Sequence, residues 1–124
     1  MKKIIASPNA PKAVGPYSQA VENNGTIYVS GQLPIDGATG KMAEGIEEQT
    51  RQSLTNIRYI LEEAGYALTD VAKVTVLLDD IADFAAMNGV YATFYTEQMP
   101  ARVCSEVAKL PMGAKVEIDA IAVK

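Results

Sequence analysis

Histidine is absent from this chain of 124 residues, and cysteine occurs once, at Cys104. These shortages exclude Ser-His and Cys-His nucleophile pairs, and they exclude the usual zinc sites, because one thiol cannot supply three or four nitrogen and sulfur ligands. One cysteine cannot form a disulfide within the chain, which is typical of a reducing, intracellular setting. Any catalysis therefore has to use carboxylates, Arg, Lys, Tyr, Ser, backbone amides or the single thiol.

Basic clusters and long apolar runs are lacking as well. The net charge is −4 and no run of Lys and Arg exceeds two residues, which argues against a surface that follows nucleic-acid phosphates. No apolar stretch has the length of a membrane span, and the run at 4–6 is too short for a signal-peptide core. Neither nucleotide-binding glycine motif, GxGxxG or GxxxxGK[ST], occurs. We expect a cytoplasmic protein that binds neither membranes nor nucleic acid.

The composition that is present, 48% apolar and 21% charged residues, is typical of one globular domain, here 1–124. Periodicity predicts two helices, at 46–64 and 81–97, the second capped by Asp80 and carrying an apolar stripe that we expect in the core. Strands are predicted at 4–6, 18–22, 26–30 and 71–78, with Asn23-Asn24-Gly25 as a hairpin turn, and two more between 100 and 124. The order β-β-β-α-β-α-β-β favours an α+β fold with one mixed sheet and both helices on one face.

The other face of that sheet presents a difficulty. The segments VAKVTVLL (71–78) and AIAV (120–123) carry too many apolar residues for two helices to cover both faces. Further copies of the chain would bury the second face, so we expect a homo-oligomer.

The segment from Pro100 to Asp119 has the most suggestive chemistry. It reads as two strands joined by a Pro-Met-Gly turn, and alternation places Arg102, Cys104 and Glu106 on one face of the first strand. Glu117 and Asp119 share a face of the second. An ordinary ion pair across a hairpin, worth under about 1 kcal/mol, would account for this spacing, and so would a functional arginine and carboxylate.

A second suggestive point is Gly31, which ends the strand at 26–30. A glycine there indicates either a bend or bulge, or the close approach of another group to the backbone. The sequence is compatible with both interpretations.

Several motifs together resemble the Rid family, whose founding members are called YjgF and RidA. They are GPYSQA (15–20), YVSGQLP (28–34), the pair Thr39-Gly40, QTRQSLTNI (49–57) and, most specifically, the ordered set Pro100, Arg102, Val107, Leu110, Pro111 and Glu117. The match runs along the whole chain. It implies a chorismate-mutase-like α+β fold and a homotrimer in which the sheets form a central barrel, with sites in clefts between subunits.

The resemblance also implies a reaction, the hydrolysis of 2-imino or enamino acids such as 2-iminopropanoate and 2-iminobutanoate to 2-keto acids and ammonia. No cofactor or metal is implied, because a protonated C=N carbon is already electrophilic. Arg102 would bind the substrate carboxylate in a bidentate manner and Glu117 would activate water. The rest of the implied site is Tyr17 from a neighbouring chain, backbone groups of Gly31 with Ser30 and Asn88 beside it, and Cys104 on the pocket wall.

Two positions depart from the family pattern. The segment TEQMP (96–100) is shorter than in typical members, and Asp119 stands where glutamate is common. Asp119 shares a strand face with Glu117, and an extra carboxylate nearby raises the proton affinity of either one. For Cys104 a small buried apolar role is an alternative to a functional thiol, and Tyr17 equally suits an ordinary interface aromatic.

Three functions are compatible with these residues. Besides the deaminase, the chain could be a non-catalytic binder or sensor of small 2-keto acids, which needs Arg102 but not Glu117. RNA cleavage or inhibition of translation, also attached to the family, fits the acidic composition and missing histidine least.

Overall fold

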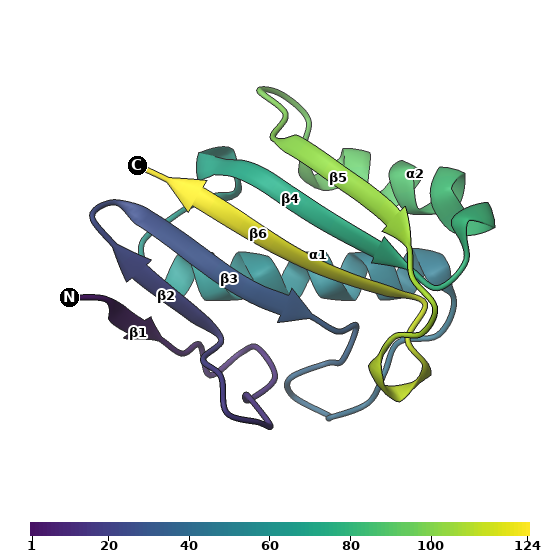
Figure 1. Ribbon diagram of the computed structural model, residues 1–124, viewed down its shortest axis with the longest axis horizontal. Helices are drawn as coiled ribbons and strands as arrows, with labels where there is room; N and C mark the ends of the chain where they lie inside the picture. The colour runs from purple at the N-terminus through teal and green to yellow at the C-terminus, as the bar shows by residue number, and fades with distance from the viewer.

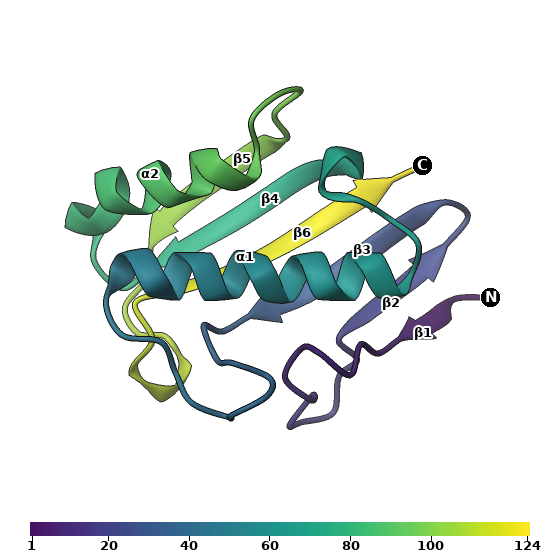
Figure 2. The same ribbon diagram turned by 180° about the vertical axis from the view of Figure 1, so that it is seen from behind.

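A computed structural model describes all residues from 1 to 124, and it consists of one six-stranded sheet with two helices packed on one face (Figures 1 and 2). The helices are α1 (Ile46–Glu63) and α2 (Phe84–Phe94). The strands are β1 (Lys3–Ile5), β2 (Ala20–Asn23), β3 (Thr26–Gln32), β4 (Val71–Leu78), β5 (Ala101–Glu106) and β6 (Val116–Val123). The predicted element order and the α+β class are confirmed.

The strands lie in the order β1-β2-β3-β6-β4-β5 (Figure 1). Only β4 and β5 are parallel, and α2 connects them; every other pair is antiparallel, so the sheet is mixed as predicted. The β2–β3 hairpin closes through Asn24 and Gly25, whose φ angles of 50° and 77° suit a two-residue hairpin turn.

The predicted hairpin between the last two strands is wrong, because β4 lies between β5 and β6. The connection passes the end of β4 instead. There the N–H of Val107 donates to the carbonyl of Leu78 at 2.8 Å, and the N–H of Asp79 donates to the carbonyl of Lys115 at 2.9 Å. The number of residues between two strands does not show whether the strands pair directly, as in a hairpin, or have another strand between them. A cross-strand ion pair between Arg102 and Glu117 is therefore excluded within the chain.

The core lies between the helices and one face of the sheet. Leu54, Ile57 and Leu61 of α1 are fully buried there. The second helix differs from prediction. Asp80 caps a short 3₁₀ turn (Ile81–Asp83) by accepting from the N–H of Ala82, and α2 ends at Phe94.

Only part of the predicted apolar stripe of α2 is core. Met87, Tyr91 and Tyr95 are buried, whereas the side chains of Ile81 and Phe84 remain 48% and 40% exposed.

The face of the sheet opposite the helices carries an apolar row. Register places four residues side by side across β1, β2, β3 and β6: Ile4, Val21, Tyr28 and Ile121. Ile4 and Tyr28 are at least half exposed in the isolated chain. The predicted excess of apolar residues on this face is confirmed for β6 through Ile121, whereas β4 presents Lys73, Thr75 and Leu77 here, because its other apolar residues are buried on the helix side. Neither helix combines the length and the apolar character that a membrane crossing requires.

Candidate functional site

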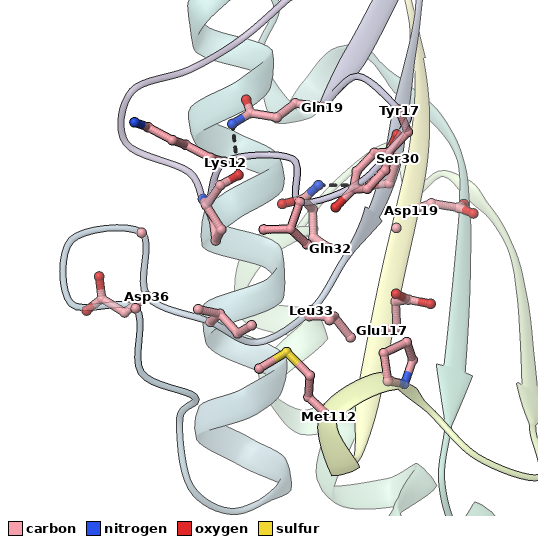
Figure 3. A pocket seen from close by; sticks show the side chains of 17 residues that line it. Lys12, Tyr17, Gln19, Ser30, Gln32, Leu33, Asp36, Met112, Glu117 and Asp119 are labelled. Carbon is pink, nitrogen blue, oxygen red and sulfur yellow. Dashed lines mark hydrogen bonds between the residues drawn. The ribbon is translucent and has the colours of Figure 1, made fainter.

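The predicted site residues fall into two groups in the chain. The first group, Tyr17, Ser30, Gly31 and Glu117, lines a cavity of about 800 Å³ together with Asp119. Figure 3 shows Tyr17 and Ser30 at one end of this cavity near β6, which supplies Glu117 and Asp119, while Lys12 and Asp36 lie at the other end. The loops before β2, after β3 and before β6 complete the wall.

Gly31 and Glu117 are in close contact, for a local structural reason. The β3–β6 register shifts between Val29 and Gln32, so a bulge forms at this point of β3. A Cβ atom on Gly31 would lie 3.0 Å from Cδ of Glu117 and 3.2 Å from its Oε2. Both sequence interpretations of Gly31 are thus confirmed, since the strand bulges and a carboxylate lies against the glycine.

Glu117 has chemistry suited to proton transfer. Burial raises the pKa of its carboxyl above the ordinary 4.5, and the negative charge of Asp119 raises the pKa further. No cation offsets these effects, because the one ion pair within 4 Å in the chain joins Arg51 to Glu48. A carboxylate with a raised pKa is a stronger base at neutral pH than an ordinary glutamate.

Two buried amides hold the cavity wall, and sequence reasoning missed both. Gln19 accepts from the N–H of Ser7 at 2.7 Å and donates to the carbonyl of Pro11 at 2.9 Å, which fixes the loop before Tyr17. Asn56 of α1 donates to the carbonyls of Leu33 at 3.2 Å and Ile35 at 2.9 Å, on the opposite wall. The sequence does contain a signal for Asn56: it is a polar residue on the apolar face of a predicted helix, and buried polar side chains are normally hydrogen-bonded.

The second group lies on edge strand β5, on the helix side of the sheet. The Arg102 guanidinium donates through Nη1 to Oδ1 of Asn88 at 2.8 Å, and its Cζ lies 4.7 Å from the centre of the Tyr91 ring and 5.6 Å from that of Phe84. Asn88 therefore lies beside Arg102, and within the chain it is not beside Gly31. No carboxylate lies within 4 Å of this arginine.

Cys104 follows Arg102 on the same face of β5 and packs against the core while remaining partly exposed. Burial raises the pKa of its thiol, and the nearby Arg102 charge lowers it by less. The thiol form is favoured, as in a small buried apolar residue.

The two groups are too far apart within one chain to bind one small molecule. Register aligns Arg102 with Val74 of β4 and, through it, with Ala120 of β6. Arg102 and Glu117 are thus about 10 Å apart across the strands and about 10 Å apart along them, and they project from opposite faces. A four-carbon acid cannot reach both.

Comparison with known proteins identifies the family. The family model described as endoribonuclease L-PSP matches residues 7–124. The chain belongs to this family, the YjgF/RidA family. It is 54% identical over 125 residues to a RutC family protein of Pyrococcus horikoshii, covering 100% of this chain and 99% of that protein. It is 48% identical over 127 residues to the 2-iminobutanoate/2-iminopropanoate deaminase of Salmonella typhimurium, covering 100% and 99%.

Solved structures of family members have the same fold. The YjgF gene product of E. coli superimposes with a TM-score of 0.96 at 46% identity, covering 98% of each chain. E. coli TdcF with bound serine gives a TM-score of 0.96 at 42% identity, again covering 98% of each chain. The resemblance inferred from the Arg102 and Glu117 motifs is therefore confirmed at the level of family and fold.

Proposed function

We propose that this chain is a hydrolytic deaminase that converts 2-iminopropanoate and 2-iminobutanoate to 2-keto acids and ammonia. The observation that carries the proposal is a split site, with an arginine lacking any acidic partner on one edge and a carboxylate of raised pKa in a cavity on the other face. Relatives that are 46–50% identical over the whole chain are named for this reaction, and a relative binds serine, another small 2-substituted acid.

The residues have complementary roles in the reaction. The guanidinium of Arg102 binds the substrate carboxylate through two parallel N–H donors. Glu117 takes a proton from water as the water oxygen bonds to C2 of the protonated C=N group. It then returns that proton to the nitrogen, the C2–N bond breaks with its electron pair on nitrogen, and ammonia leaves. Glu117 takes the proton of the C2 hydroxyl as the keto group forms, and this proton finally converts the ammonia to ammonium. A positioned base contributes about 10²- to 10⁴-fold to such a step.

Because Arg102 and Glu117 lie far apart within one chain, a site that contains both requires two copies of the chain. Arg102, Asn88 and Cys104 of one copy face Tyr17, Ser30, Gly31 and Glu117 of its neighbour across a cleft between subunits. Three copies arranged head to tail would repeat the contact, and the apolar row on the free sheet face would line the central barrel of a homotrimer.

A coupled assay tests the activity. A serine or threonine dehydratase generates the imino acid in situ, and keto-acid formation is followed with and without the purified protein. Acceleration by the wild type, with at least about a tenfold loss in Arg102→Ala and Glu117→Gln, is expected from the loss of a charge-assisted bond and of the base. No acceleration by the wild type would sink the proposal.

Subunit mixing tests the shared site. Arg102→Ala and Glu117→Gln proteins are unfolded together and refolded as mixed oligomers. Random mixing leaves about one quarter of the clefts with both residues intact, so about a quarter of wild-type activity should return. Arg102→Ala mixed with itself is the control. If no activity returns although mixed oligomers form, both residues belong to one chain's site.

Binding without catalysis is the second candidate, because the arginine and its contacts lie apart from Glu117 and could hold a 2-keto acid alone. Glu117→Gln separates the two functions. If the protein is a deaminase, Glu117→Gln should lose turnover but still bind 2-ketobutanoate. If the protein is a sensor, Glu117→Gln should bind 2-ketobutanoate and signal as the wild type does.

A further inference from the structure

The environment of Arg102 is unusual for a guanidinium that is only partly exposed, because no acidic group lies near it. Charged side chains removed from water are normally paired. Every contact that Arg102 makes on the helix side is neutral. These contacts are the Asn88 amide oxygen at 2.8 Å, the Met87 sulfur at 3.9 Å and the two rings of Phe84 and Tyr91.

All four contacts come from α2, and their spacing is that of a single helix face. Phe84, Met87, Asn88 and Tyr91 stand at positions i, i+3, i+4 and i+7. Much of the α2 stripe that was predicted to lie in the core therefore surrounds the Arg102 guanidinium. We call these four residues, Phe84, Met87, Asn88 and Tyr91, the cradle. Phe84 illustrates this, since it is 40% exposed and yet lies over the guanidinium.

The chemistry of the cradle restrains the arginine without neutralising it. A guanidinium has five N–H donors in a planar fork, and the contacts within the chain use only Nη1. An aromatic face stabilises the cation and removes no donor. An amide oxygen accepts one bond and adds no net charge, whereas a carboxylate in its place would form an ion pair and occupy the same fork.

We propose that Asn88 is a positioning residue which, with the rings of Phe84 and Tyr91, holds the Arg102 guanidinium oriented and unneutralised for the carboxylate of the ligand. This inference rests on the proposed function and deepens it. Asn88 acts through Arg102 and does not itself contact the ligand, which revises its predicted place beside Gly31. The neutral amide at residue 88 becomes the determinant of affinity for the acid.

Asn88→Asp is the sharpest test, because it keeps the shape of the side chain and adds one negative charge. The dissociation constant for 2-ketobutanoate, measured by calorimetry, and the KM for the imine should both rise about 10- to 100-fold, while kcat changes by less than about threefold. Asn88→Ala, which loses orientation but gains no charge, should show a smaller rise, about 3- to 10-fold.

A charge placed elsewhere on the same helix is the matched control. Thr93 is exposed on α2, five residues after Asn88, so it lies on another side of the helix. Thr93→Asp adds the same charge and should leave affinity within twofold of wild type. The thermal midpoint of each variant shows whether loss of affinity follows loss of fold.

The aromatic part of the cradle has its own test, which does not depend on Asn88→Asp folding. Phe84→Leu should weaken 2-ketobutanoate binding about two- to fivefold, and Phe84→Tyr, which keeps the ring, should restore it. Equal binding by Phe84→Leu and the wild type would show that the ring does not act on the arginine.

These outcomes separate the inference from the proposed function. Suppose that the wild type binds 2-ketobutanoate but hydrolyses no imine, and that Asn88→Asp binds 2-ketobutanoate more weakly. This result overturns the proposed deaminase activity and supports the positioning role of Asn88. Asn88→Asp that binds as tightly as the wild type overturns the positioning role and keeps the deaminase. A wild type that neither hydrolyses the imine nor binds 2-ketobutanoate overturns both.

Discussion

Gly31 leaves just enough space for the side chain of Glu117, because a methyl group at Gly31 would lie 3.0 Å from Cδ and 3.2 Å from Cγ of that glutamate. The glycine is needed here for space, since its φ lies outside the left-handed region. The backbone of β3 thereby forms one wall for the carboxylate and limits how it can turn.

Substitution of Gly31 by alanine should therefore displace the Glu117 carboxylate. We expect kcat to fall about 10- to 100-fold, a part of what a positioned base contributes, while the far-UV spectrum is unchanged. Steady-state kinetics in the coupled assay measure this effect. Undiminished kcat in Gly31→Ala would show that the carboxylate works from another rotamer.

Gly89→Ala is the matched glycine variant, and it should raise the stability of the fold. Gly89 is exposed inside α2, and a Cβ there would meet no atom within 4 Å. Alanine should raise the free energy of unfolding by about 0.5–1 kcal/mol, because glycine loses more backbone entropy in a helix. Urea unfolding measures this change, and a lower midpoint would contradict it.

Asp119→Asn should shift the pH dependence of turnover. The pKa of Glu117 is raised first by burial and then by the charge of Asp119, so removing that charge lowers the pKa. Turnover requires the deprotonated carboxylate and falls as the pH drops through this pKa. The acid limb of the kcat profile should therefore move to lower pH. A limb that stays in place or moves upward would show that Asp119 does not act on Glu117.

Asn56→Ala should destabilise the fold and loosen the cavity. Asn56 is completely buried, donates to the carbonyls of Leu33 and Ile35, and accepts from the side chain of Gln52. Its loss leaves the Ile35 carbonyl without a partner, leaves the Leu33 carbonyl with only the N–H of Ile35, and should cost about 2–4 kcal/mol in urea unfolding.

Arg51→Ala on the same helix is the control for Asn56→Ala. It removes only an exposed ion pair of 3.5 Å with Glu48 and should change the stability by less than about 0.5 kcal/mol. If the two variants lose similar amounts of unfolding free energy, the Asn56 hydrogen bonds contribute no more to stability than an exposed ion pair does.

The elements of the fold were largely predictable because their signals are local. The periodicity of 46–64 matches α1 to within one residue at its end, and Asn24-Gly25 marks the hairpin turn. The insertion of β4 between β5 and β6 was not predictable in this way, since strand neighbours across a long connection are decided by non-local packing.

The candidate site shows a similar limit. Residue types pointed to an arginine and a carboxylate, and Gly31 pointed to a close contact. Periodicity correctly placed one face of α2 toward the rest of the protein, yet it cannot tell whether that face meets apolar side chains or a cation, which is why the Phe84 and Asn88 contacts were missed. The catalytic roles of Arg102 and Glu117 stay predictions.

The position of β6 has a consequence for how the chain acquires its fold during synthesis. The last strand in the sequence occupies the middle of the sheet, between β3 and β4. The β1–β2–β3 sheet and the β4–α2–β5 unit must therefore wait, each with an unpaired strand edge, until the final segment arrives to join them. Exposed edges of this kind invite pairing with other chains. Slow translation or truncation before Val116 should thus favour aggregation over a stable partial fold, and shielding by chaperones matters most in that interval.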